Sequence, residues 1–136
     1  MKQELLIVDD EYIILLMHKT IVVEEGLHES PHIIMDGELA LEYIKDNDEP
    51  GNAYLVLLDI NMPGMSGWAF LDAIQAQEWN SRIHVAILTS SVNASDRIKA
   101  TEYPQVLAYI EKPLINRHIL EIKEHPKLAG YWNKGK

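Results

Sequence analysis

Cysteine is absent from the 136 residues of this chain. No disulfide can form and no thiolate can bind zinc, so nothing in the sequence indicates an oxidising compartment. Long apolar runs are also missing: none is longer than Tyr12 to Met17, which is far shorter than the ~20 residues that cross a bilayer. Basic residues number 12 against 21 acidic ones, and this net charge of −9 disfavours binding to nucleic acid or to an anionic membrane. We therefore expect a cytoplasmic protein.

Five short apolar runs alternate with segments of helical length. The runs cover residues 5–8, 32–35, 54–58, 84–88 and 107–110. The amphipathic segments cover residues 12–25, 37–45, 67–78, 94–102 and 116–124, with Asp36 and Ser66 as expected N-caps and Gly26 as a helix stop. Continuous apolar runs of this length are typical of strands covered on both faces. The alternation predicts a doubly wound α/β domain with a five-stranded parallel sheet and helices on both faces.

Chemically active side chains stand where these strands end. Asp9 and Asp10 follow the first run, Asp59 the third, Thr89 the fourth and Lys112 the fifth. Because the carboxyl ends of parallel strands lie at one edge of a sheet, we expect these five groups to meet there. Three adjacent carboxylates repel one another, and a hard divalent cation such as Mg²⁺, with Mn²⁺ as the alternative, would resolve the conflict. Asp59 is then the best nucleophile, since a carboxylate can accept a phosphoryl group.

Taken singly, each of these residues also has a structural explanation. The acidic pair can cap a helix, Asp59 can belong to a turn, Thr89 can be a cap, and Lys112 can be a solvated surface residue. The six histidines are scattered, without a metal-binding spacing to a third ligand, and are interpreted as structural or surface residues.

Four ordered segments resemble the receiver domain of bacterial two-component response regulators. They are LLIVDDE at 5–11, LLDINMPGMSG at 57–67, ILTS at 87–90 and YIEKP at 109–113. The resemblance covers residues 3 to 125. It implies a flavodoxin-like fold with strand order 2-1-3-4-5, a receiver domain over residues 1–125, and a short tail at 126–136 without an output domain, whose end from Leu128 we expect to fray.

The resemblance also implies a site. Asp59 would be the phosphoacceptor and a metal ligand, Asp10 would bind Mg²⁺ directly, and Asp9 would act through a bound water. The backbone carbonyl of Asn61 would be a further ligand. Lys112 would pair with Asp59 and then with the phosphoryl group.

A switch is implied as well. The hydroxyl of Thr89 would move toward the phosphoryl oxygen, and the ring of Tyr109 would turn inward. The side chains of Asn61 and Ser91 would flank the attacking water and tune dephosphorylation.

The last motif carries both a match and a departure. A cis peptide bond between Lys112 and Pro113 is implied by the family pattern. Leu114 stands where the family more often has Phe, and residues 101–106 replace the usual Gly-Ala turn. Both departures fall on the face of the fourth and fifth helices, which receivers use for partners.

The first helix has more apolar residues than one buried face requires. Nine of the twelve residues from Tyr12 to Val23 are apolar. Packing between the sheet and neighbouring helices would explain this, but the resemblance favours docking of a histidine kinase or phosphotransfer protein on that helix.

The favoured function is therefore a stand-alone receiver, not an enzyme acting on an external substrate. It would take a phosphoryl group from a histidine kinase or phosphotransfer protein and act on a downstream protein, with a phosphorylation-dependent homodimer left open. One alternative is a phosphatase of the haloacid-dehalogenase type, which needs a general acid at position 61, where Asn61 cannot serve. A docking module that is never phosphorylated is the other.

Overall fold

The sheet has the parallel order predicted from the sequence. The computed structural model describes residues 2–90, 93–128 and 132. Its strands are β1 (Gln3–Val8), β2 (His32–Ile34), β3 (Ala53–Asp59), β4 (Arg82–Thr89) and β5 (Val106–Glu111). Their order is β2-β1-β3-β4-β5, with every neighbouring pair parallel. The flavodoxin-like order 2-1-3-4-5 is confirmed.

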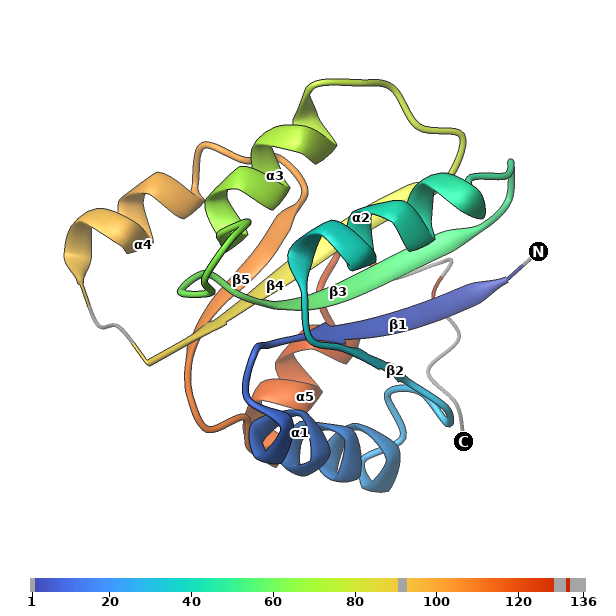
Figure 1. Ribbon diagram of the computed structural model, residues 1–136. Helices are drawn as coiled ribbons and strands as arrows, with labels where there is room; N and C mark the ends of the chain where they lie inside the picture. Colours follow the sequence, from blue (N-terminus) through green and yellow to red (C-terminus); the bar gives the residue numbers. More distant parts are fainter. Residues whose placement is uncertain (1, 91–92, 129–131, 133–136) are drawn as a thin grey trace.

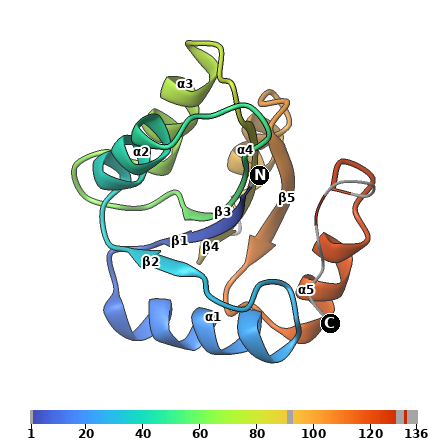
Figure 2. The same cartoon turned by 90° about the vertical axis from the view of Figure 1, so that its right-hand side faces the viewer.

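Helices cover both faces of this sheet. Helices α1 (Tyr12–Glu24) and α5 (Asn116–Lys123) lie against one face, and α2 (Gly37–Asp46), α3 (Gly67–Gln75) and α4 (Ala94–Ala100) lie on the other (Figure 1, Figure 2). Alternate residues of the strands feed two separate apolar clusters, one under each helical layer. All seven residues of β3 are buried, so the strand that carries Asp59 lies at the centre of the domain.

Local sequence signals set most helix boundaries. Asp36 caps α2 by accepting the N–H groups of Glu38 at 2.7 Å and Leu39 at 3.2 Å. The hydroxyl of Ser66 caps α3 in the same way. Gly26, which follows α1, has a φ of 74° that favours glycine.

Two helices are shorter than the periodicity predicted by two or more residues. Helix α3 ends at Gln75 instead of residue 78, and α4 ends at Ala100 instead of residue 102. At the end of α3 the indole of Trp79 turns back and donates to the carbonyl of Ile74 at 2.8 Å. A side chain thereby takes a carbonyl near the end of the helix, and the chain continues as a loop.

The expectation of a frayed tail is wrong for two of its residues. Leu128 and Trp132 are buried, 0% and 4% exposed, in the cluster beneath α1 and α5. The indole N–H of Trp132 donates to the carbonyl of Leu27 at 3.3 Å. Two large apolar side chains remove enough surface from water to hold Leu128 and Trp132 against the domain. None of the helices in the described ranges has the length and apolar character to span a bilayer.

Candidate phosphoacceptor site

Three carboxylates meet at the carboxyl ends of β1 and β3. Asp9, Asp10 and Asp59 each place one oxygen within 4.8 Å of the others. Asp9 and Asp59 are only 2% and 4% exposed. Oxygen donors at this spacing fit a hard cation such as Mg²⁺, which prefers carboxylates and water. The prediction that separate strand ends bring these side chains together is correct.

The ammonium group of Lys112 lies between two of these carboxylates. Its Nζ is 2.7 Å from Asp9 Oδ2 and 3.5 Å from Asp59 Oδ2. The shorter contact is with Asp9, although the sequence resemblance pairs the lysine with Asp59. Asp9 also accepts the N–H of Glu11 through its other oxygen, at 2.9 Å. Asp9 therefore links the start of α1 to the lysine.

Burial and neighbouring charge act on the pKa of both partners. Burial raises the pKa of Asp59, the charges of Asp9 and Asp10 raise it further, and the Asn61 amide and Lys112 oppose the change. For Lys112, burial lowers the pKa, but the hydrogen bond to Asp9 and the charge of Asp59 outweigh it and raise the pKa above the ordinary value. The lysine stays charged in a site whose central carboxylate is costly to ionise.

Asn61 joins the end of β3, where Asp59 lies, to β4. Its backbone N–H donates to Asp59 Oδ1 at 3.0 Å, and its side-chain Nδ2 donates to the hydroxyl of Thr89 at 3.2 Å. Thr89 is completely buried, and its carbonyl accepts the N–H of Lys112 at 2.8 Å. Asp59, Thr89 and Lys112 are thus connected through hydrogen bonds of three neighbouring strands.

Close packing fixes the segment between Asp59 and α3. A Cβ on Gly67, the first residue of α3, would lie 2.5 Å from the Cα of Ile60 and 2.8 Å from the carbonyl oxygen of Asp59. Only glycine allows this approach of two backbones. The helix is thereby seated directly behind the candidate phosphoacceptor.

Tyr109 lies two residues before the end of β5, partly buried and packed against the core on the α3 side. The guanidinium of Arg97 on α4 lies 4.8 Å from the centre of the Tyr109 ring and donates to the Tyr109 carbonyl at 3.5 Å.

The peptide bond between Lys112 and Pro113 is cis, as the family pattern implied. Ser91, expected to tune dephosphorylation, lies outside the described residues.

Comparison with known families agrees with this arrangement. Residues 5–124 match the response regulator receiver domain. The chain belongs to that family.

Two solved receiver structures and one curated relative are similar to this receiver domain. The two component response regulator from Cytophaga hutchinsonii has 25% identity and a TM-score of 0.75, covering 88% of this chain and 92% of the other. A CheY-like receiver domain protein from Methanospirillum hungatei JF-1 has 32% identity and a TM-score of 0.63, covering 88% and 90%. The probable methanogenesis regulatory protein FilR2 of Methanothrix harundinacea (strain 6Ac) is 33% identical over 68% of this chain and 63% of its own length.

One residue near the site of this receiver was not identified from the sequence as functional. His18 of α1 is only 2% exposed, and its charge environment includes Lys112 and Asp9. The helical spacing did carry a signal, because His18 shares a face with Leu15 and Val22, which are both buried. Spacing predicts burial but says nothing about what the imidazole touches.

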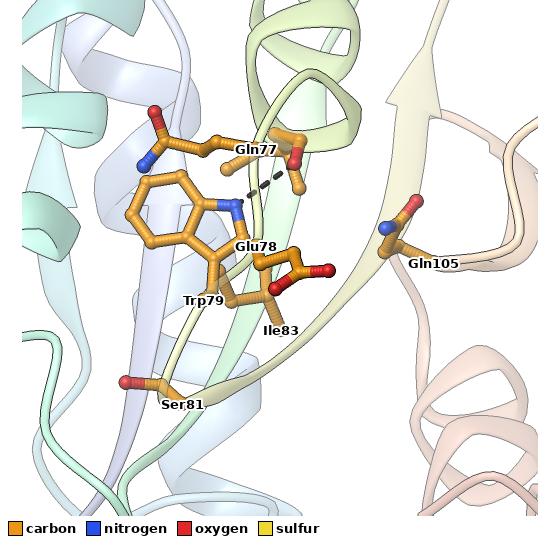
Figure 3. A pocket seen from close by; sticks show the side chains of 7 residues that line it. Gln77, Glu78, Trp79, Ser81, Ile83 and Gln105 are labelled. Carbon is orange, nitrogen blue, oxygen red and sulfur yellow. Dashed lines mark hydrogen bonds between the residues drawn. The ribbon is translucent and has the colours of Figure 1, made fainter.

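A pocket of about 400 Å³ lies at the opposite end of the strands from Asp59. Its lining comes from the end of α3, the following loop and the starts of β4 and β5 (Figure 3). The lining residues are Ile74, Gln77, Glu78, Trp79, Ser81, Ile83 and Gln105. The pocket is separate from the site built by Asp59 and Thr89, which lie at the other ends of β3 and β4.

Proposed function

We propose that this receiver domain accepts a phosphoryl group on Asp59 from a phosphohistidine of a histidine kinase or phosphotransfer protein. The observation that carries the proposal is the setting of Asp59: a buried carboxylate, 3.5 Å from Lys112, that shares a site with Asp9 and Asp10. A carboxylate oxygen of Asp59 attacks phosphorus, and the phosphorus–nitrogen bond breaks. The electron pair stays on the donor imidazole, which takes up a proton, and an acyl phosphate forms.

The chain's own residues neutralise the charge that this transfer brings in. Asp10 and Asp59, with Asp9 through water and the Asn61 carbonyl, would hold Mg²⁺, which when bound supplies positive charge opposite the phosphoryl oxygens. Lys112 contributes its ammonium, and the Asn61 N–H, already bonded to Asp59, adds a donor. The hydroxyl of Thr89 would donate to a phosphoryl oxygen.

The change would reach the surface through Thr89 and Tyr109. Thr89 is bonded to Asn61, so movement of its hydroxyl toward a phosphoryl group rearranges a contact that exists in the present state. Tyr109 lies on the same face of the sheet as Thr89. It pairs with Ile87 of β4, and Ile87 and Thr89 are two residues apart, so their side chains point to the same face. A ring turned inward there would alter the surface that α4 and β5 present to a downstream protein.

The exposed side of α1 supports docking of the phosphoryl donor. Tyr12, Ile13 and Met17 are 53%, 68% and 51% exposed, at the end of the domain where Asp9 and Asp10 lie. An apolar helix face beside a phosphoacceptor suits a helical partner that must bring its histidine close to Asp59.

Beryllofluoride, a mimic of the acyl phosphate, gives the direct test. We expect Mg²⁺-dependent binding by the wild type and none by Asp59→Asn, together with phosphorylation of the wild type by acetyl phosphate. Absence of beryllofluoride binding to the wild type would favour the docking module, and turnover of general phosphate monoesters would favour the phosphatase.

A further inference from the structure

The segment that carries Lys112 is held by few backbone hydrogen bonds. Lys112 donates its N–H to the carbonyl of Thr89 at 2.8 Å, on the β4 side. Pro113 has no N–H to donate. The next donor is the N–H of Leu114, which points to Nε2 of His18 on α1 at 3.5 Å. The His18 imidazole is therefore the backbone's first hydrogen-bond acceptor beyond the lysine, at a residue whose side chain also packs, 4% exposed, in the cluster beneath α1 and α5.

The burial of His18 is not explained by packing alone. It lies 2% exposed in the row of Leu15 and Val22, the apolar residues of the same buried face of α1. Within the described residues its Nδ1 has no hydrogen-bond partner, and leaving a buried polar atom unpaired destabilises the fold. The other ring nitrogen, Nε2, accepts the backbone N–H of Leu114.

The imidazole is also kept in the form that can accept. Burial and the nearby charge of Lys112 lower the pKa of His18 to about 4, against a smaller opposing effect of Asp9. At neutral pH the ring is therefore uncharged, and Nε2 retains its lone pair toward the Leu114 N–H. Lys112 thus has the uncharged imidazole of His18 nearby, and its ammonium group contacts the carboxylates of Asp9 and Asp59.

Placement of the ammonium group matters for the chemistry. Lys112 Nζ lies 2.7 Å from Asp9 and 3.5 Å from Asp59. From this position between the two carboxylates it must reach a phosphoryl group on Asp59. A displacement of about 1 Å in such a group can cost ~100-fold in rate. We propose that His18 is a positioning residue, which accepts the Leu114 N–H and so fixes Lys112 for phosphoryl transfer to Asp59. This inference rests on the proposed function.

Three variants separate positioning from packing. His18→Leu fills the space but removes the acceptor, and His18→Gln keeps an oxygen at similar reach. His84→Leu makes the same histidine-to-leucine change at the other end of the sheet, near the start of β4, and serves as the control. For each we would measure the maximal rate constant for phosphorylation by acetyl phosphate, the affinity for Mg²⁺ alone by calorimetry, stability in urea, and hydrogen exchange of the Leu114 amide.

We expect His18→Leu to lower the maximal rate constant by roughly tenfold, the effect of one lost hydrogen bond expressed in the transition state. Its Mg²⁺ affinity and its stability at neutral pH should not fall, and the Leu114 amide should exchange faster. His18→Gln should recover most of the rate, and His84→Leu should match the wild type.

A His18→Leu protein that is phosphorylated at the wild-type rate would overturn the proposal. So would a loss of rate accompanied by equal losses of Mg²⁺ affinity and stability, which would indicate general distortion. If the wild type takes up no phosphoryl group, the proposed function fails, and the Leu114 amide alone decides whether His18 holds this segment: unchanged exchange in His18→Leu would refute it.

Discussion

Replacing Asp59, the proposed phosphoacceptor, by its neutral amide should stabilise the domain when no divalent cation is present. Asp59 is 4% exposed, and its pKa is raised by burial and by the charges of Asp9 and Asp10. An acid whose folded-state pKa is raised costs stability at every pH above that pKa, and the cost disappears as the pH falls below the ordinary value near 3.8. Asp59→Asn removes the charge but keeps an oxygen that can accept the Asn61 N–H.

The magnitude follows from the distances. With an effective dielectric constant of about 20, each of the two carboxylate pairs that include Asp59 repels by roughly 3.5 kcal/mol at 4.8 Å, the outer limit of the distances between their oxygens. The contact of Asp59 with Lys112 at 3.5 Å is attractive by roughly 5 kcal/mol on the same scale. Two repulsions exceed one attraction by roughly 2 kcal/mol, and removal of the desolvation cost adds to the gain. For a domain of this size, roughly 2 kcal/mol corresponds to a rise in Tm of about 6 °C.

Thermal and urea unfolding in EDTA would measure the effect. Glu42→Gln, which removes one exposed negative charge from α2, controls for the change in net charge and should stay within about 0.5 kcal/mol of the wild type. Added Mg²⁺ should stabilise the wild type more than Asp59→Asn, because the variant lacks one ligand. An Asp59→Asn protein less stable than the wild type in EDTA would show that the Lys112 contact outweighs the repulsion, and the electrostatic account of this site would be wrong.

Acid should weaken the fold through His18, whose pKa of about 4 lies below its ordinary value of 6.5. The free energy of unfolding that this shift contributes is complete above pH 6.5, and about 3 kcal/mol of it is lost as the pH falls toward 4. Urea titrations at several pH values should show a shallower loss in His18→Leu, and parallel curves would contradict the assignment. In urea unfolding, Gly67→Ala should destabilise the domain by about 3 kcal/mol or more, because the new Cβ would meet backbone atoms of residues 59 and 60. Gly64→Ala should cost about 1 kcal/mol, because there is open space around the new Cβ and only the φ of 75° is unfavourable. Ile13→Glu should slow phosphotransfer from the cognate kinase about tenfold and leave acetyl phosphate reactivity unchanged, and equal loss in both assays would argue against docking on α1.

The sheet and the acidic site were predictable because both follow from strand ends. Parallel strands need continuous apolar runs, and these are visible in the sequence as residues 5–8 and 54–58. Once the sheet is parallel, Asp9 and Asp59 must lie at one edge, whatever the details of packing. Periodicity also placed the helices, and it erred only at ends such as that of α3, where a loop side chain sets the boundary.

Other features depend on contacts between distant segments and have no local signal. The preference of Lys112 for Asp9 over Asp59 is decided by less than 1 Å, at distances of 2.7 and 3.5 Å. The docking of Trp132 on Leu27 joins residues 105 positions apart. Contacts between His18 and Leu114 are of the same kind. Such details could not be read from residue spacing because they are set by tertiary packing.

The loop that departs from the family pattern is fastened to α3 instead of being a simple turn. Tyr103 is 7% exposed, its hydroxyl donates to Asp72 at 2.7 Å, and its ring stacks on Trp68 at 5.8 Å. Burial and the bond to Asp72 raise the pKa of Tyr103 to about 12, so the hydroxyl remains a donor at neutral pH. Lys99 of α4 lies 4.6 Å from the centre of the same Trp68 ring. Helix α4 itself buries only Ala100, so the contact of Lys99 with Trp68 and the anchoring of the loop that follows add to what holds it beside α3. A partner that binds α4 and β5 would therefore meet a surface whose shape α3 also determines.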